Sequence, residues 1–268
     1  MGDSATLPLT LTNGGGLPAS FELRELDKGM APMGRRDESR FQVDPRQQSQ
    51  RTTEGLEPPP LPQAAPLAAG DVIQTWPTGL AYAWGLGYNH QEEDLWLGDI
   101  PYFGGTDRDY RFLPDGTNTG DFIDTSWSTY FAADIAYNLN SGMLWQVDVG
   151  NPGCIHELDP VNKVPTGNTI CPNFGVSQRG LAYDPTTDTY FAGSWNDGMV
   201  YRFAPDGTML EQVYVGLPIA GLAYNPDTRH LFVMTNASPN PVYVLDVANN
   251  YVIVGQFTVP GFSAYGGA

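Results

Sequence analysis

Few residues in this chain of 268 amino acids have the types and spacing that catalysis requires. It contains three histidines, His90, His156 and His230, and none lies near a Gly-x-Ser-x-Gly motif, which would expose a nucleophilic serine. The Gly-rich run at 14–16 separates two alternating stretches, so it is typical of a hairpin turn rather than of a phosphate loop. We therefore expect a protein without catalytic residues and without a cofactor.

Acidic side chains are the next candidates, as oxygen ligands for a metal ion. Asp107, Asp109, Asp115 and Asp121, with Asn118, carry the ligand atoms that calcium prefers. Their spacing is not that of an EF-hand loop, and Asp-Gly is ordinary turn chemistry. Solvated turns are the favoured interpretation, and we expect no metal site.

The two cysteines, Cys154 and Cys171, enclose a gap of 16 residues and form no CxxC motif. Only His156 lies near enough in the sequence to act as a further metal ligand. A structural disulfide is the favoured interpretation, and disulfides are typical of exported proteins. We therefore expect an extracellular protein, either secreted or held at the cell surface.

The charge balance excludes two classes of partner. Thirteen basic and 30 acidic residues give a formal net charge of −17, which argues against binding to nucleic acid or to anionic lipid. No run of apolar residues is long enough to span a membrane, so we expect no membrane insertion.

Four internal repeats indicate the fold. Each begins with a short, small-residue apolar stretch that ends in tyrosine followed by Asn or Asp, and the four tyrosines are Tyr88, Tyr137, Tyr183 and Tyr224. They lie 49, 46 and 41 residues apart, which is the length of a four-stranded propeller blade. Alternating apolar residues and regular turn signals favour strands throughout. The sequence therefore predicts an all-β protein, a β-propeller of four-stranded blades.

The domain organisation follows from these repeats. We expect an N-terminal β-hairpin over 1–27, an extended Pro/Arg/Gln-rich linker over 28–69 and the propeller over 70–268. Residues 71–76 resemble an outer strand, which would close the ring by pairing with the last blade. Residues 261–268 look like the opening of a fifth blade.

Several short motifs resemble β-propeller modules of large secreted bacterial multidomain proteins, which often accompany subtilisin-like peptidase and Ig-like domains. They are Trp-Pro-Thr-Gly-Leu at 76–80, Trp-Gly-Leu-Gly-Tyr at 84–88, the stretch from Arg to Gly at 111–120, and Gly-Leu-Ala-Tyr-Asp-Pro at 180–185. These motifs are structural and include no catalytic residue. The resemblance implies secretion and a modular, non-catalytic role.

The leading functional hypothesis is a structural subunit that assembles with itself into a filament or surface layer through its N-terminal tail. Residues 24–51 carry seven basic and five acidic residues, whereas residues 71–268 carry six basic and 21 acidic ones. The net charges of +2 and −15 would attract each other, and an isolated hairpin needs a partner sheet. The expected partner is therefore another copy of the chain.

Two alternatives come from other functional classes. The first is a ligand-binding or targeting module of a secreted subtilisin-like peptidase, with a protein or glycan as its ligand; Trp127 and Trp195 could stack on sugars. The second is a propeller lyase or lactonase, in which Asp134 and Asp148 would imitate the central metal site of such enzymes.

Overall fold

The structure is a computed structural model, and it describes five stretches of the chain: residues 68–100, 107–128, 130–150, 153–236 and 241–259.

The described residues belong to one compact unit of the chain, residues 65–268. The hairpin expected over 1–27, nearly all of the linker expected over 28–69 and the blade opening expected at 261–268 lie outside the described residues. Within these residues, no helix is long and apolar enough to cross a membrane.

Sixteen strands of the described residues form four antiparallel sheets of four strands each. The strands of blades 1 and 2 are β1 (Ala83–Asn89), β2 (Asp94–Asp99), β3 (Arg108–Phe112), β4 (Asn118–Asp124), β5 (Ala132–Asn138), β6 (Met143–Asp148), β7 (Ile155–Asp159) and β8 (Val164–Ile170). The strands of blades 3 and 4 are β9 (Gly180–Asp184), β10 (Thr189–Gly193), β11 (Met199–Phe203), β12 (Met209–Tyr214), β13 (Ile219–Asn225), β14 (His230–Thr235), β15 (Val242–Asp246) and β16 (Val252–Phe257). A short 3₁₀-helix, η3 (Val247–Asn249), precedes β16.

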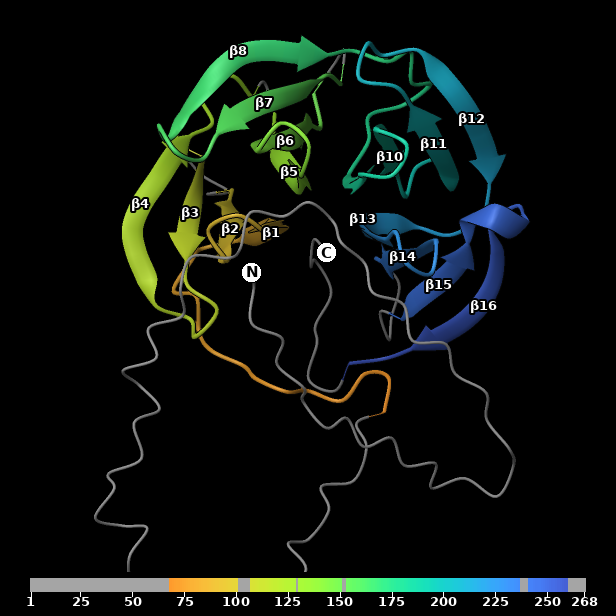
Figure 1. Cartoon of the computed structure of the whole chain (residues 1–268), viewed down its shortest axis with the longest axis horizontal. Helices are drawn as coiled ribbons and strands as arrows, with labels where there is room; N and C mark the ends of the chain where they lie inside the picture. The colour runs from red at the N-terminus through yellow and green to blue at the C-terminus, as the bar shows by residue number, and fades with distance from the viewer. Residues whose placement is uncertain (1–67, 101–106, 129, 151–152, 237–240, 260–268) are drawn as a thin grey trace, which may run out of the picture. The chain divides into compact units, whose positions relative to one another are not determined.

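Within the described residues the four sheets are arranged in a ring and form a four-bladed β-propeller, which confirms the four-stranded blades that the repeats predict (Figure 1). In each sheet the strands follow chain order, from the innermost strand to the outermost one. The inner strands β5 and β9 are buried along their whole length, whereas β8 is exposed except at its last residue. Strands covered on both faces read as continuous apolar runs, which explains the small apolar stretch at the start of each repeat.

The four repeat tyrosines occupy equivalent positions in their blades. Each is the penultimate residue of an innermost strand, and each pairs with the second residue of the neighbouring strand: Tyr88 with Leu95, Tyr137 with Leu144, Tyr183 with Tyr190 and Tyr224 with Leu231. The Asn or Asp that follows each tyrosine starts the turn to the second strand. Its side-chain oxygen accepts a hydrogen bond from the backbone N–H two residues later, at 2.9–3.0 Å.

The hydrophobic core lies between neighbouring blades rather than at one centre. Trp96 of blade 1 packs in one cluster with Leu144 of blade 2. Trp145 of blade 2 and Tyr190 of blade 3 share a second cluster, and their rings meet edge to face at 5.9 Å. A third cluster joins blades 3 and 4 around Phe191. Each blade therefore depends on its neighbour for the burial of its apolar face.

One buried carboxylate ties the innermost strands together. The Oδ2 atom of Asp134, in β5, accepts hydrogen bonds from the backbone N–H groups of Leu181 and Leu222, each at 2.9 Å. The backbone N–H groups of Leu86 and Ile135 also favour the charged form of this carboxylate. Burial raises the pKa of Asp134 well above its usual range, and these N–H groups oppose that rise. Residues of all four innermost strands thus converge on one side chain.

The segment that precedes β1 differs from the expectation. No strand forms over 71–76, so the predicted pairing of an outer strand with the last blade is wrong within the described residues. Instead, the backbone of Gly70 lies against the carbonyl oxygen of Thr258, just after β16. The Trp76 ring stacks on Phe112 of blade 1 at 5.3 Å. Contacts at single residues, rather than a ladder of backbone hydrogen bonds, therefore hold this segment against the blades.

Candidate functional site

A pocket of about 570 Å³ opens at the mouth of the ring, defined here as the end at which the innermost strands begin. It is lined by residues of four connections, those between β4 and β5, β6 and β7, β8 and β9, and β10 and β11: Tyr130, Val149, Gly150, Phe174, Gly175, Val176, Ser177, Arg179 and Asn196. We call this site the mouth pocket. One connection leads from blade 1 into blade 2 and the other three belong to blades 2 and 3, so the pocket lies at the junction of blades 2 and 3.

Arg179 is the charged residue of the mouth pocket, and backbone pairing fixes its position. Its N–H donates to the carbonyl oxygen of Gly193 at 2.8 Å, and its own carbonyl accepts from the N–H of Asp134 at 3.2 Å. The residue directly before β9 is therefore tied both to β10 of its own blade and to β5 of blade 2. Arg179 is only 8% exposed, although it lines the pocket.

The guanidinium of Arg179 is held by neutral groups. Its Nη1 atom donates to the carbonyl oxygen of Ser177 at 2.6 Å, to the Ser177 hydroxyl at 2.7 Å and to the Ser194 hydroxyl at 3.4 Å. Its Nε atom is buried and has no hydrogen-bond partner in the described part of the chain. Part of the donor capacity of this side chain is therefore unused.

Two tryptophans from different blades extend this arrangement. The guanidinium carbon of Arg179 lies 4.4 Å from the ring centroid of Trp195, a cation–π distance. Trp195 in turn stacks on Trp84 of blade 1, with centroids 5.8 Å apart and planes 7° from parallel. The Trp195 ring therefore contacts both Arg179 and Trp84, and these contacts within the protein account for its position better than stacking on a sugar.

No carboxylate forms an ion pair with Arg179 among the described residues. Asp197 is the acid that acts on it electrostatically, but Asp197 accepts from the Tyr201 hydroxyl at 2.7 Å and from the backbone N–H of Met199 at 3.1 Å. Burial lowers the pKa of Arg179, and the charge of Asp197 opposes that effect. Four of the five other described arginines and lysines, Arg108, Arg111, Lys163 and Arg202, pair with Asp or Glu, and the fifth, Arg229, is exposed.

The disulfide predicted from the sequence is present and supports the mouth pocket. Cys154 and Cys171 are bonded, with Cα atoms 4.3 Å apart. Cys171 follows β8, at the start of the connection that carries Phe174, Ser177 and Arg179. The bond therefore anchors the base of this connection to the start of β7.

The acidic residues considered for calcium do not converge. Asp115 lies in an exposed turn and accepts from the N–H of Thr117 at 2.9 Å. Asp109 is fully buried, and its Oδ1 accepts from Nε2 of Gln146 at 2.9 Å. Burial raises the pKa of Asp109 to about 7; the Gln146 bond opposes the rise and the charge of Asp107 adds to it. In the part of the chain that the structure describes, no three His, Cys, Asp or Glu side chains are grouped to hold a metal ion.

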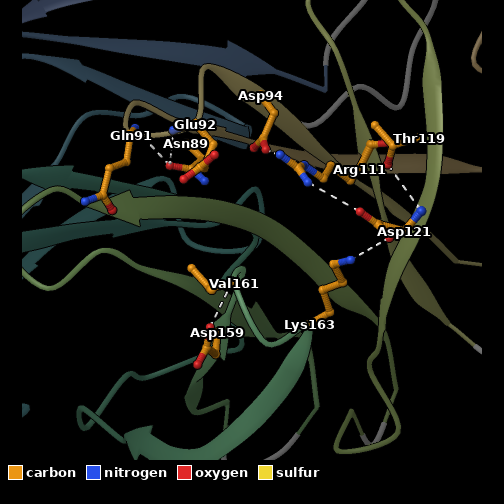
Figure 2. Close-up of polar contacts among 10 residues, drawn as sticks. All are labelled: Asn89, Gln91, Glu92, Asp94, Arg111, Thr119, Asp121, Asp159, Val161 and Lys163. Carbon is orange, nitrogen blue, oxygen red and sulfur yellow. Dashed lines mark hydrogen bonds and ion pairs between the residues drawn. The ribbon is translucent and has the colours of Figure 1, made fainter. Parts of the chain in front are cut away.

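Asp121, the fourth of these acids, belongs to an ionic chain between blades 1 and 2 (Figure 2). Arg111 of β3 pairs with Asp94 and, at 3.3 Å, with Asp121 of β4. Lys163, in the turn after β7, reaches the same Asp121 at 2.6 Å. A similar contact joins blades 3 and 4: the hydroxyl of Tyr251, in the turn before β16, donates to Glu211 of β12 at 2.6 Å. These contacts join blades and do not form a ligand site.

The remaining candidates are also held by partners within the chain. Asp148 accepts from the Ser128 hydroxyl at 3.1 Å and from the N–H of Gly150 at 3.0 Å, whereas Asp134 is bound to backbone N–H groups. Trp127 stacks on His156, with ring centroids 4.0 Å apart. The pair Asp134 and Asp148 is thus not grouped as a metal site within the described residues.

Comparison with known proteins assigns the chain to no family. No protein-family model matches the chain, and no curated protein matches it. Among the solved structures that match is that of a protein of unknown function from Bacteroides caccae, at 14% identity and a TM-score of 0.48. The match covers 66% of this chain, and the chain spans 60% of the length of that structure.

Proposed function

We propose that the propeller is a non-catalytic ligand-binding module, and that the mouth pocket is its binding site. The observation that carries this proposal is the position of Arg179, a buried cation that forms no direct ion pair with any described residue and that lines a pocket at the junction of two blades. The pocket volume of about 570 Å³ falls within the range of small-molecule sites, about 300–1,000 Å³. The mixture of apolar side chains with a few polar ones is also usual for such sites.

The placement of the histidines supports a non-catalytic role. His90 lies in the turn between β1 and β2, His156 in β7 and His230 at the start of β14, so the three belong to different blades. His156 stacks on Trp127, and the Ser128 hydroxyl nearby donates to Asp148 rather than to a histidine. A serine nucleophile is activated when its hydroxyl donates to a base, usually a histidine, and the contacts of Ser128 and His156 differ from that arrangement.

We further propose that the protein is extracellular and part of a modular secreted protein. The disulfide supports this location, because disulfides persist in oxidising compartments. The motifs at 76–80 and 84–88, which resemble those of secreted multidomain proteins, support the modular context. Self-assembly through residues 1–69 stays a proposal that rests on the opposite charges of the two segments and on an expected hairpin that needs a partner sheet, and deletion of this tail from filament-forming material would test it.

A fragment screen would test the ligand-binding proposal. Ligand-observed NMR with the full chain should find fragments whose binding is lost in a Tyr130→Ala variant. Tyr130 is 71% exposed and lines the pocket, so the variant should fold. Tyr214→Ala is the matched control, because Tyr214 is 73% exposed on the outer strand β12. Fragments that bind equally well to both variants, or no fragments at millimolar concentration, would overturn the proposal.

A further inference from the structure

We infer that the mouth pocket takes a small molecule that carries a carboxylate on an aromatic or sugar ring, with the carboxylate bound by Arg179. The inference rests on the proposed function and specifies its ligand. It starts from the guanidinium of Arg179, whose hydrogen bonds within the described residues go to neutral oxygens and not to a carboxylate.

A buried guanidinium is normally paired. Removing a charge from water is costly unless an opposite charge or several dipoles replace the water. Around Arg179 the replacement consists of two hydroxyls, one carbonyl oxygen and the face of Trp195, all of them uncharged. Asp197 places a negative charge nearby, but its oxygens accept from Tyr201 and Met199, and it forms no ion pair with Arg179 in the described part of the chain. An anion that enters the mouth pocket would pair with the guanidinium directly.

The charge of the surroundings favours a monoanion over a phosphate. Residues 71–268 carry a net charge of −15, so any anion approaches against a repulsive field, and a dianion is repelled more strongly. Arg179 is the one cationic residue among those that line the pocket. One guanidinium matches one carboxylate in charge and in planar geometry.

The other lining residues indicate what the carboxylate is attached to. Val149, Phe174 and Val176 provide apolar surface, and the ring of Tyr130 is largely exposed. Gly150 and Gly175 leave room beside these side chains. Exposed aromatic rings bind the faces of flat or sugar rings. Both an aromatic acid and a sugar acid present a carboxylate next to such a ring.

Isothermal titration of the full chain with four probes tests the inference. Sodium benzoate and sodium galacturonate carry the carboxylate, and benzamide and galactose are their neutral counterparts. We expect at least one acid to bind about tenfold or more tightly than its neutral counterpart, because hydrogen bonds to a charged group are the stronger ones. Whichever acid binds identifies the ring as aromatic or as a sugar.

Two arginine variants separate the local site from the overall charge. Arg179→Gln should weaken binding of the acid roughly 10- to 100-fold, whereas Arg108→Gln should leave it unchanged. Arg108 pairs with Asp124 on the outside of blade 1, so its loss changes the net charge equally. If Arg179→Gln does not fold, the comparison of acid with neutral probe and the Tyr130→Ala variant decide the question.

The possible failures are distinguishable. Neutral probes that bind as tightly as the acids, and depend on Tyr130, would overturn the carboxylate inference and leave the ligand-binding proposal standing. The same holds if no acid binds while other fragments depend on Tyr130. If nothing that binds depends on Tyr130, both the inference and the proposed function are overturned.

Discussion

The buried carboxyl of Asp109 should make the protein more stable in mild acid than at neutral pH. Burial raises the pKa of Asp109 to about 7, whereas the ordinary value of an aspartate is 3.8. Between these two values the folded state binds more protons than the unfolded state, so stability falls as the pH rises. The contribution is fully present below pH 3.8, is lost as the pH rises through 7 and is constant above that. Asp107, whose pKa burial also raises, changes stability in the same direction.

The magnitude follows from the two pKa values. Between pH 5 and pH 8, a shift from 3.8 to about 7 removes roughly 2–3 kcal/mol of stability. The substitution Asp109→Asn removes the titrating group but keeps an oxygen that can accept from Gln146. The variant should therefore match the wild type near pH 5 and exceed it by this amount at pH 8. For a domain of this size, the difference corresponds to about 5–10 °C in melting temperature.

Thermal unfolding of both proteins at pH 5, 6, 7 and 8 measures this difference. Asp115→Asn is the control, because it removes the same charge from a fully exposed turn, where Thr117 lowers the pKa of the carboxyl. The difference in melting temperature between Asp115→Asn and the wild type should stay constant from pH 5 to pH 8. An Asp109→Asn variant whose melting temperature runs parallel to that of the wild type from pH 5 to pH 8 would refute the reasoning.

Substitutions at three places, the disulfide, Asp134 and Tyr183, test how the ring is held together. Replacing Cys154 and Cys171 by serine should lower the free energy of unfolding by about 3 kcal/mol in urea, as reduction of the wild type should; no fall would contradict the loop-closure argument. Asp134→Ala, which leaves two buried backbone N–H groups without an acceptor, should cost about 2–5 kcal/mol by the same measurement, and Asp134→Asn should cost less. Tyr183→Ala should cost about 3–5 kcal/mol because this ring is buried, whereas Tyr214→Ala on the surface should cost little; equal melting temperatures would show that Tyr183 contributes no packing energy.

The fold could be predicted because its information is local and repeated. Each blade is a meander of neighbouring strands, so the pairing partners lie close in the sequence, and one pattern recurs four times. Turn residues after Tyr137 and Tyr183 mark the strand ends for the same reason. The disulfide follows from the same proximity, because Cys154 and Cys171 flank the antiparallel pair β7 and β8.

The segment before β1 shows the limit of prediction from local sequence patterns. Residues 71–76 have the alternation of an outer strand, yet they form none in the described residues. Whether such a segment pairs depends on a partner edge nearly two hundred residues away. Contacts of Gly70 with Thr258 and of Trp76 with Phe112 decide its position, and no pattern in the sequence records them.

The sequence by itself determined the blade repeat, the order of strands and the disulfide, because each of these depends on residues that are near one another along the chain. Only the tertiary structure decided which partners each polar residue meets. Asp134 reads as a possible metal ligand, but its Oδ2 accepts from backbone N–H groups of blades 3 and 4. Arg179 reads as an ordinary residue before a strand, and its burial among neutral oxygens is a property of the folded surroundings alone.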